Sequence, residues 1–176
     1  MSSKIASVIV ALGLMGAAVL AQGAKPTDPQ IAHIAYTAGS IDIEAAKQAL
    51  QMSKNKDVRA FAEQMVKDHE AVNKQALDLC KKLGVTPEDN DTSKSLAAAA
   101  KAKRDELATM SGAAFDKAYI DNEVAYHKTV NGALESTLIP SAQNAQLKSL
   151  LQTGLKIFQG HQQHAEMAAS MIKSAQ

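Results

Sequence analysis

The chain has 176 residues, of which 46% are hydrophobic and only 3% aromatic, and its formal net charge at pH 7 is +1. No basic block or basic stripe with interleaved aromatic residues occurs, so we do not expect nucleic-acid binding. Cys80 is the single cysteine, which excludes an intramolecular disulfide, and it is most simply a small buried hydrophobic residue.

The N-terminal residues have the layout of a secretory signal peptide. Lys4 precedes an apolar run rich in Ala, Val, Leu and Gly, and small residues stand before a cleavage site after Ala21. The run is short for a membrane-spanning helix, which needs about 20 apolar residues. We therefore expect a signal peptide over residues 1–21 (to about 24), a periplasmic or secreted location, and no stable membrane insertion after cleavage.

The remainder, residues 28–174, is predicted to be a single all-α domain. It is rich in alanine and poor in aromatic and β-branched clusters, a composition that favours closely packed helices over a sheet. Asp28 is the expected N-cap of the first helix, Gly84 follows the second, and Pro140 is expected to end the fourth. The predicted helices cover about 29–52, 56–83, 93–110, 115–138 and 143–172.

Four long helices and one short, charged helix predict a four-helix bundle. The short helix lies between the second and third long ones, which fits the crossover connection of a ferritin-like fold. An α-solenoid is the weaker alternative, because no repeat of fixed period is visible.

Ionisable residues interrupt the apolar stripes of these helices. His69 stands between Met65 and Val72 in the second helix, and Glu123 and His127 share a face of the fourth. His161 and His164 follow the apolar residues of the last helix, and Glu44 lies at the edge of the stripe of the first. Glu44, His69 and His127 are each about 13 to 15 residues from the start of their helix, which at about 1.5 Å per residue places them near the waist of a bundle.

A buried imidazole or carboxylate is costly without a partner. For a single histidine, a hydrogen bond within the core would be sufficient explanation, but similar depths on four helices favour a transition-metal site. The candidate ligands are Glu44, His69, His127, His164, His161 and Glu123. The alternative is a metal-free layer of hydrogen-bonded polar side chains.

Several motifs carry a family resemblance. The signal peptide, FAEQMVKDHEAV, FDKAYIDNEVAYHKTV and HQQHAEMA together resemble a ferritin-like family of secreted bacterial proteins known chiefly as a domain of unknown function. The resemblance covers residues of about 28 to 174. It implies functional positions at Glu44, Asp68 with His69, Phe115 with Asp116, Tyr119, His127 and His164.

The sequence departs from a di-iron carboxylate bundle, which uses two Glu-x-x-His pairs and two further glutamates. No Glu-x-x-His occurs here; the nearest motif is Glu123-x-x-x-His127. The predicted site is therefore rich in nitrogen, which favours Zn, Cu or a single Fe. We expect no organic cofactor and infer no iron storage.

Three functions remain open from the sequence. The first is a periplasmic or secreted metal-binding bundle whose reaction is unknown, and whether it is an enzyme is undecided. The second is a non-enzymatic envelope or stress-related protein that binds a partner and has a metal-free polar core. The third is non-covalent haem binding by His and Met, since the absence of Cys-x-x-Cys-His excludes covalent attachment.

Overall fold

A computed structural model describes residues 25–174, and these residues form helices with no strand. The all-α prediction is therefore confirmed, whereas the expected signal peptide, residues 1–21, lies outside the described residues. No described helix is long and apolar enough to cross a membrane. The elements are α1 (Asp28–Met52), α2 (Lys56–Leu83), α3 (Asp91–Ala108), α4 (Gly112–Ala133), the π-helical turn η1 (Leu134–Leu138), α5 (Ile139–Ser141) and α6 (Ala145–Ser174).

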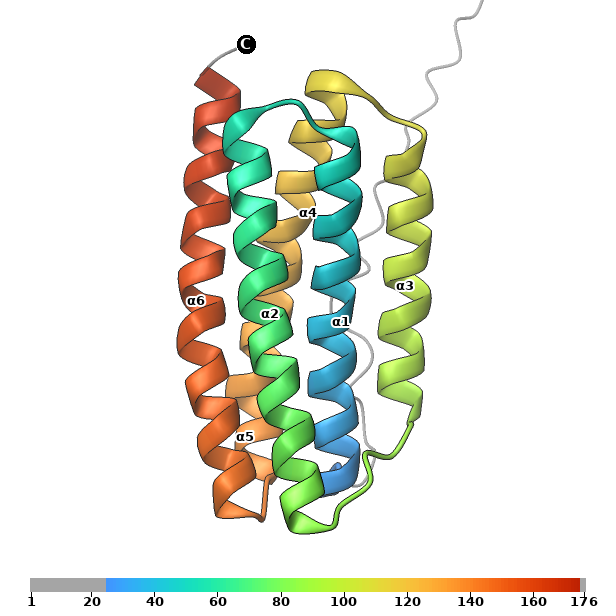
Figure 1. Cartoon of the computed structure of the whole chain (residues 1–176), viewed down its shortest axis with the longest axis vertical. Helices are drawn as coiled ribbons and strands as arrows, with labels where there is room; N and C mark the ends of the chain where they lie inside the picture. The colour runs from blue at the N-terminus through green and yellow to red at the C-terminus, as the bar shows by residue number, and fades with distance from the viewer. Residues whose placement is uncertain (1–24, 175–176) are drawn as a thin grey trace, which may run out of the picture.

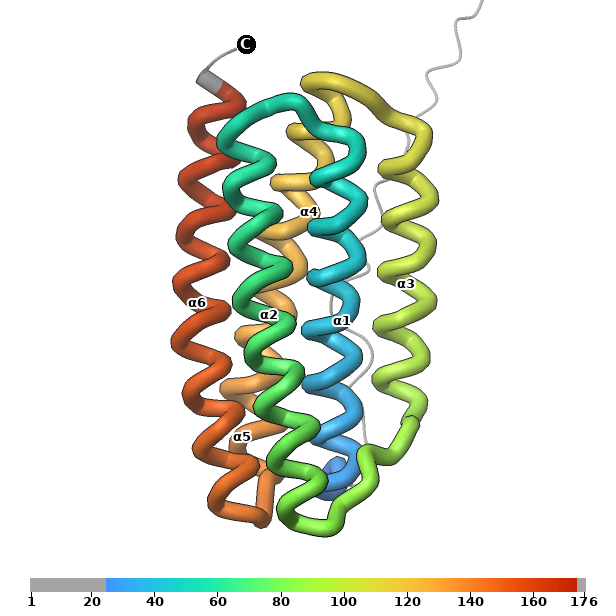
Figure 2. Tube along the Cα trace, viewed as in Figure 1, coloured from blue at the N-terminus to red at the C-terminus, as the bar shows by residue number. Residues whose placement is uncertain are grey.

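The four long helices α1, α2, α4 and α6 run side by side, and α3 lies on the outside against α1 (Figure 1). Followed along the chain, α1 runs up, α2 down, α3 up, α4 down and α6 up (Figure 2). Because α3 carries the chain back along the bundle, α2 and α4 point the same way. Only Ser93 and Leu107 of α3 are buried, in agreement with the prediction of a peripheral crossover helix.

The helix ends follow local sequence signals, but the predicted start of the first helix and the predicted end of the fourth need correction. Thr27, not Asp28, is the N-cap of α1, and it forms a capping box with Gln30. Asp28 instead accepts hydrogen bonds from the backbone N–H groups of Gln143 and Asn144, both at 2.8 Å, just before α6. Gly84 caps α2 at a φ of 65°, as expected for a left-handed C-cap.

Pro140 does not end the fourth helix where the sequence predicted. Proline lacks the backbone N–H of a helix and its ring clashes with the carbonyl of residue i−4. The chain adapts with the π-helical turn η1, in which the N–H of Ile139 bonds to the carbonyl of Leu134, five residues back. Pro140 then sits inside the short helix α5.

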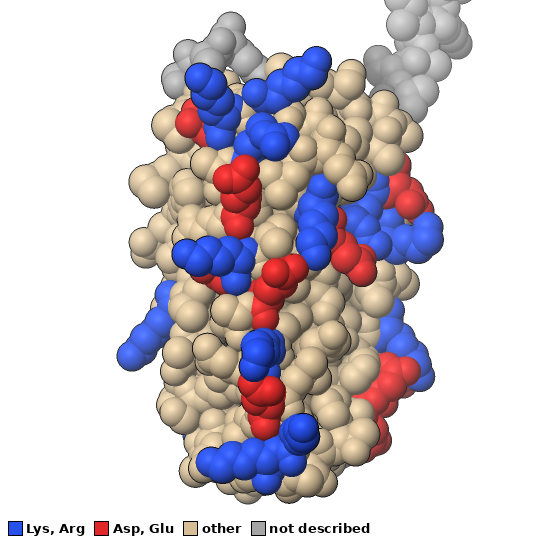
Figure 3. Space-filling view, in the orientation of Figure 1, with Lys and Arg blue, Asp and Glu red and all other residues tan. Residues whose placement is uncertain are grey.

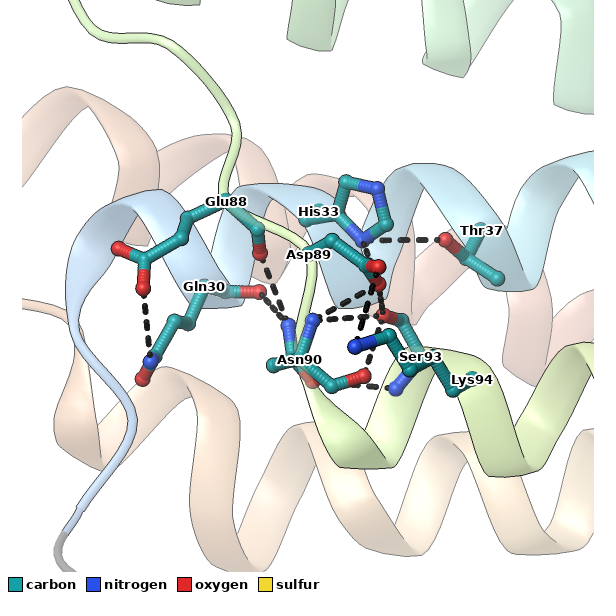
Figure 4. A network of polar contacts seen from close by, with 8 residues as sticks. All are labelled: Gln30, His33, Thr37, Glu88, Asp89, Asn90, Ser93 and Lys94. Atoms are coloured by element: carbon teal, nitrogen blue, oxygen red, sulfur yellow. Dashed lines mark hydrogen bonds and ion pairs between the residues drawn. The ribbon is translucent and has the colours of Figure 1, made fainter.

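The loop between α2 and α3 is fastened to the start of α1 by a polar network (Figure 4). Asn90 caps α3 and its side-chain amide bonds to the carbonyl oxygens of Gln30 and Glu88. Asp89 accepts from the hydroxyl of Ser93 at 2.9 Å, and this bond lowers the pKa of the Asp89 carboxyl. His33 belongs to this outer network, so it lies apart from the other histidines.

A close approach between α1 and α2 depends on Gly39. A Cβ at this position would lie 3.0 Å from Cγ of Asn73 and closer still to its Oδ1. The Asn73 amide donates to the carbonyl of Tyr36 and to the hydroxyl of Ser40. Gly39 is therefore a point at which α1 and α2 approach each other closely.

We expect Gly39→Ala to lower the free energy of unfolding by about 1–3 kcal/mol, because the added methyl forces Asn73 out of its hydrogen bonds. The matched control is Gly160→Ala on α6, where an added Cβ meets nothing within 4 Å. There the change should be neutral or stabilising by up to about 1 kcal/mol, since alanine has the higher helix propensity. Urea denaturation measures both, and equal effects would contradict the assigned contact.

Two apolar clusters fill the core, one toward each end of the bundle. The first includes Phe61, Met65, Phe115, Tyr119 and Ile120. The second is lined by Ile31, Ile34, Leu134, Leu138, Ala142, Leu147, Leu151 and Phe158. Each long helix has at least one buried ionisable side chain between the two clusters, and these side chains form the candidate site.

Candidate metal centre

Five ionisable side chains meet between the two apolar clusters. They are fully or almost fully buried, and all four long helices contribute. His69, His127 and His161 form one group whose candidate ligand atoms lie within 4.8 Å of one another, and Asp42, Glu123 and His127 form a second. Since His127 belongs to both groups, the five residues make one continuous cluster.

The three imidazoles surround a common point. Their ring centroids are 5.9 Å apart for His69 and His127, 5.1 Å for His69 and His161, and 5.5 Å for His127 and His161. The His69 ring is held in place by stacking on Phe158, at a centroid distance of 4.6 Å and an interplanar angle of 8°. Stacking on Phe158 therefore fixes the plane of the His69 imidazole in the metal-free protein.

His127 is oriented by its own helix. Its Nδ1 donates to the backbone oxygen of Glu123 at 3.0 Å, so the lone pair is on Nε2. Nε2 is buried and has no hydrogen-bond partner among the described residues. This is the usual arrangement of a metal-binding histidine, in which one ring nitrogen is anchored and the other is the donor.

His161 is oriented from a neighbouring helix. Its Nε2 lies 3.0 Å from Oδ2 of Asp68 on α2, while its Nδ1 is buried and unpaired within the described part of the chain. Asp68 is partly exposed, with 29% of its side chain accessible. An anionic partner raises the basicity of a ligating imidazole, so Asp68 is a positioning residue for His161.

The two carboxyl groups bind protons unusually tightly. Burial is the main cause, and it raises the pKa of Glu123 to about 7 and that of Asp42 well above its ordinary value. The negative charge of Glu123 raises the pKa of Asp42 further. Oδ2 of Asp42 also lies 3.3 Å from Nε2 of His69, which links the carboxyl pair to the imidazoles.

Burial has the opposite effect on the histidines. It lowers the pKa of His69 well below its ordinary value, lowers that of His127 to about 4, and lowers that of His161 despite the nearby Asp68. The three imidazoles are therefore neutral at pH 7. Neutral imidazole is the form that binds a metal ion.

Several buried polar atoms of the cluster have no hydrogen-bond partner among residues 25–174. Such atoms normally find a hydrogen-bond partner, because each one left without a partner costs about 1–3 kcal/mol. A cation bound between them would satisfy most of them at once, so the donor set fits a metal ion. The atoms of the cluster without a hydrogen bond are Oδ1 of Asp42, Nδ1 and Nε2 of His69, Oε2 of Glu123, Nε2 of His127 and Nδ1 of His161. Two of them have a looser polar contact, Nε2 of His69 with Asp42 at 3.3 Å and Oε2 of Glu123 with His127 at 3.7 Å.

A comparison with known families bears on this arrangement. A family model described as a domain of unknown function (DUF4142) matches residues 15–168. The chain belongs to this family. No curated protein and no solved structure matches it.

Four of the six candidate ligands predicted from the sequence lie in the cluster of this DUF4142 protein: His69, His127, His161 and Glu123. Glu44 does not, because its side chain points outward, is 57% accessible and pairs with Arg104 of α3 at 2.7 Å. Asp42, two residues earlier, takes the position that the sequence analysis gave to Glu44.

His164 also lies outside the cluster. It is one turn beyond His161 on α6, and its Nδ1 is 3.0 Å from Oε1 of Gln64 near the surface. Of the other residues implied by the family resemblance, Tyr119 lies buried beside the cluster. Burial and the charges of Glu123 and Asp42 raise the pKa of its hydroxyl.

Proposed function

We propose that this DUF4142 protein is a periplasmic or secreted ferritin-like bundle that binds one divalent transition-metal ion at Asp42, His69, Glu123, His127 and His161. The observation that carries the proposal is the set of five buried donor side chains from four helices. Imidazole with carboxylate suits Zn²⁺ and Fe²⁺ in particular.

The charge of the cluster favours one ion over two. Two ionised carboxylates and three neutral imidazoles carry a charge of about −2, which a single divalent ion neutralises. A second divalent ion would leave an uncompensated positive charge between two apolar clusters, and such charges are strongly disfavoured in a core. Metal entry would displace the protons that Asp42 and Glu123 hold.

The course of the chain supports the ferritin-like part of the proposal. Two antiparallel helix pairs, α1 with α2 and α4 with α6, are joined by one long crossover that contains α3. A single long crossover is the connection found in ferritin-like bundles, which also build metal sites from inward-facing residues of all four helices. The location rests on the N-terminal sequence alone.

Zinc titration of the metal-free full chain tests the proposal, with Asp42→Asn and Glu44→Gln as a matched pair. We expect one Zn²⁺ per chain, bound more tightly than micromolar. Asp42→Asn should weaken binding by at least about tenfold, because it removes a donor charge in the site. Glu44→Gln, two residues away and facing outward, should leave the affinity unchanged within about twofold.

Isothermal calorimetry gives affinity and stoichiometry, and elemental analysis of protein purified without chelator identifies the resident metal. Failure of Zn²⁺ and Fe²⁺ to bind below micromolar concentration would leave the metal-free polar layer as the correct description. Equal effects of Asp42→Asn and Glu44→Gln would remove Asp42 from the ligand set.

A further inference from the structure

Asp68 of α2 joins the buried cluster to the surface. The five cluster side chains are at most 3% exposed, so an ion from solvent has to pass another residue before it reaches them. Asp68 is 29% accessible, and its Oδ2 lies 3.0 Å from Nε2 of His161. The imidazole ring of His161 therefore stands between a partly exposed carboxylate and the group of three histidines.

The two ring nitrogens of His161 have different surroundings. Nε2 donates to Asp68, so the lone pair is on Nδ1, which is buried and has no hydrogen-bond partner among residues 25–174. The ring centroid lies 5.1 Å from that of His69 and 5.5 Å from that of His127. His161 thus contacts Asp68 with one nitrogen and keeps the other for the buried donor set.

Gln64 extends this connection along α2 to His164. Its amide nitrogen donates to Oδ2 of Asp68 at 3.4 Å, and its Oε1 accepts from Nδ1 of His164 at 3.0 Å. The hydrogen bonds that Asp68 accepts from Gln64 and from His161 both end on Oδ2. Oδ1 of Asp68 therefore remains for a ligand from solvent, and carboxylate oxygen is a ligand that divalent cations bind.

No cationic side chain neutralises Asp68. Figure 3 shows acidic and basic side chains alternating in a column over α2, and on this helix Lys74 pairs with Asp78 at 2.6 Å. Within the described part of the chain, Asp68 forms no ion pair with a lysine or an arginine, and its ion-pair partner is His161. An uncompensated carboxylate beside a cleft or buried site attracts cations and raises their local concentration.

We propose that Asp68 is the entry site of the buried metal centre, where a hydrated divalent cation binds before it passes the His161 ring to the cluster. This inference rests on the proposed metal centre and names the residue through which the ion reaches it. Oδ1 of Asp68 binds the arriving ion. Gln64 is exposed, so its side chain can move aside without disturbing the core.

Stopped-flow mixing of zinc with the metal-free full chain tests this assignment, with Asp68→Asn and Glu63→Gln as a matched pair. A weak, fast-exchanging zinc indicator reports the loss of free ion. The association rate constant should fall at least about tenfold in Asp68→Asn, since electrostatic focusing accelerates binding by about 10–1,000-fold. Glu63→Gln removes the same charge from an exposed position of α2 and should change the rate by less than about twofold.

Gln64→Glu is the second variant, and it keeps the test decisive if Asp68→Asn disturbs the fold. It places a further carboxylate beside Oδ2 of Asp68 at an exposed position. Zinc association should become roughly twofold faster or more, and this gain should shrink as salt is added, because salt screens exposed charges. A Gln64→Glu rate equal to that of the wild type at low salt would contradict the entry site.

The rate constants separate entry from positioning. If Asp68→Asn binds zinc at the wild-type rate and only releases it faster, the proposal is overturned, because Asp68 then acts by orienting His161 alone. Equal slowing in Glu63→Gln also overturns it, since any acidic residue of α2 would then serve. Both results leave the buried centre in place, whereas a wild type that takes up no zinc removes the centre and its entry site together.

Discussion

Zinc added to the metal-free protein at about 100 times its dissociation constant is expected to raise the melting temperature by roughly 5–10 °C. A ligand that binds only the folded state contributes about 2.7 kcal/mol at that concentration. For a chain of this size each kcal/mol corresponds to about 2–4 °C. The unfolded chain has the same five donors but cannot bring them together, so the binding energy stabilises the fold.

His127→Ala should abolish most of this zinc-dependent rise, because His127 is the one residue common to both groups of the cluster. His127→Gln is the second variant, since its side chain fills more of the space and keeps the metal-free fold closer to wild type. His33→Ala is the control, because His33 belongs to the outer network around Asp89. Differential scanning calorimetry with and without zinc measures all four proteins.

A zinc-dependent rise in His127→Ala equal to that of the wild type would place the metal elsewhere on the protein. A rise that disappears equally in His33→Ala would show that zinc binds surface histidines without preference. Either result contradicts the assigned centre, whatever the stability of the metal-free variants.

Hydrophobic periodicity located most of the cluster from sequence. His69, His127, Glu123 and His161 each occupy a position where an apolar side chain would continue the stripe of their helix, and each is buried in the structure. Buried ionisable residues are rare enough that several at similar depth indicate a shared site. On these helices the spacing was sufficient to identify the buried residues, because apolar residues continue the stripe both before and after each of them.

On α1 the apolar stripe pointed to Glu44, which lies outside the buried cluster for a geometric reason. Asp42 lies four residues after Ala38 and seven before Ala49, so it stays near the middle of the buried face. Ile41 lies at one margin of that buried face. Glu44 is three residues further along the helix, and this step places it outside the face. If each acidic residue of this helix is compared with apolar positions both before and after it, rather than with Ile41 alone, the sequence favours Asp42 over Glu44.

Other features depend on contacts that periodicity does not contain. His164 and His161 are both plausible inward positions by spacing, and only the packing of α6 on α2 decides between them. The π-helical turn at Leu134–Leu138 reflects how the helix accommodates Pro140, which the sequence alone showed as a simple stop. The contact of Asp68 with His161, at 3.0 Å between Oδ2 and Nε2, likewise depends on the packing of α6 against α2.

Glu123→Gln is expected to act in opposite directions on the metal-free and zinc-bound protein. Because burial raises the pKa of Glu123 to about 7, its ionised form opposes folding at pH 8. The amide removes that buried charge while keeping the shape of the side chain. We expect the metal-free variant to be about 1–3 kcal/mol more stable than wild type at pH 8, and its zinc affinity to fall by at least about tenfold.

The pH dependence separates this effect from general repacking. A carboxyl whose pKa is raised by folding contributes stability that is complete below its unfolded value and is lost as the pH rises through its folded value. For Glu123 that loss runs from about 4.5 to about 7. The buried histidines act oppositely, because their lowered pKa makes folding more favourable as the pH rises from about 4 to 6.5.

The buried histidines titrate in the unfolded chain around pH 6.5 in both proteins, so the difference in stability between wild type and Glu123→Gln isolates the Glu123 carboxyl. In urea denaturation the metal-free Glu123→Gln variant should become more stable relative to wild type as the pH rises from about 4.5 to 8. Zinc binding by the wild type should strengthen over the same interval, since the carboxyl protons must leave before the ion can bind. A variant that is less stable than wild type at pH 8, or a zinc affinity independent of pH, would show that Glu123 is not the buried acid whose ionisation the metal requires.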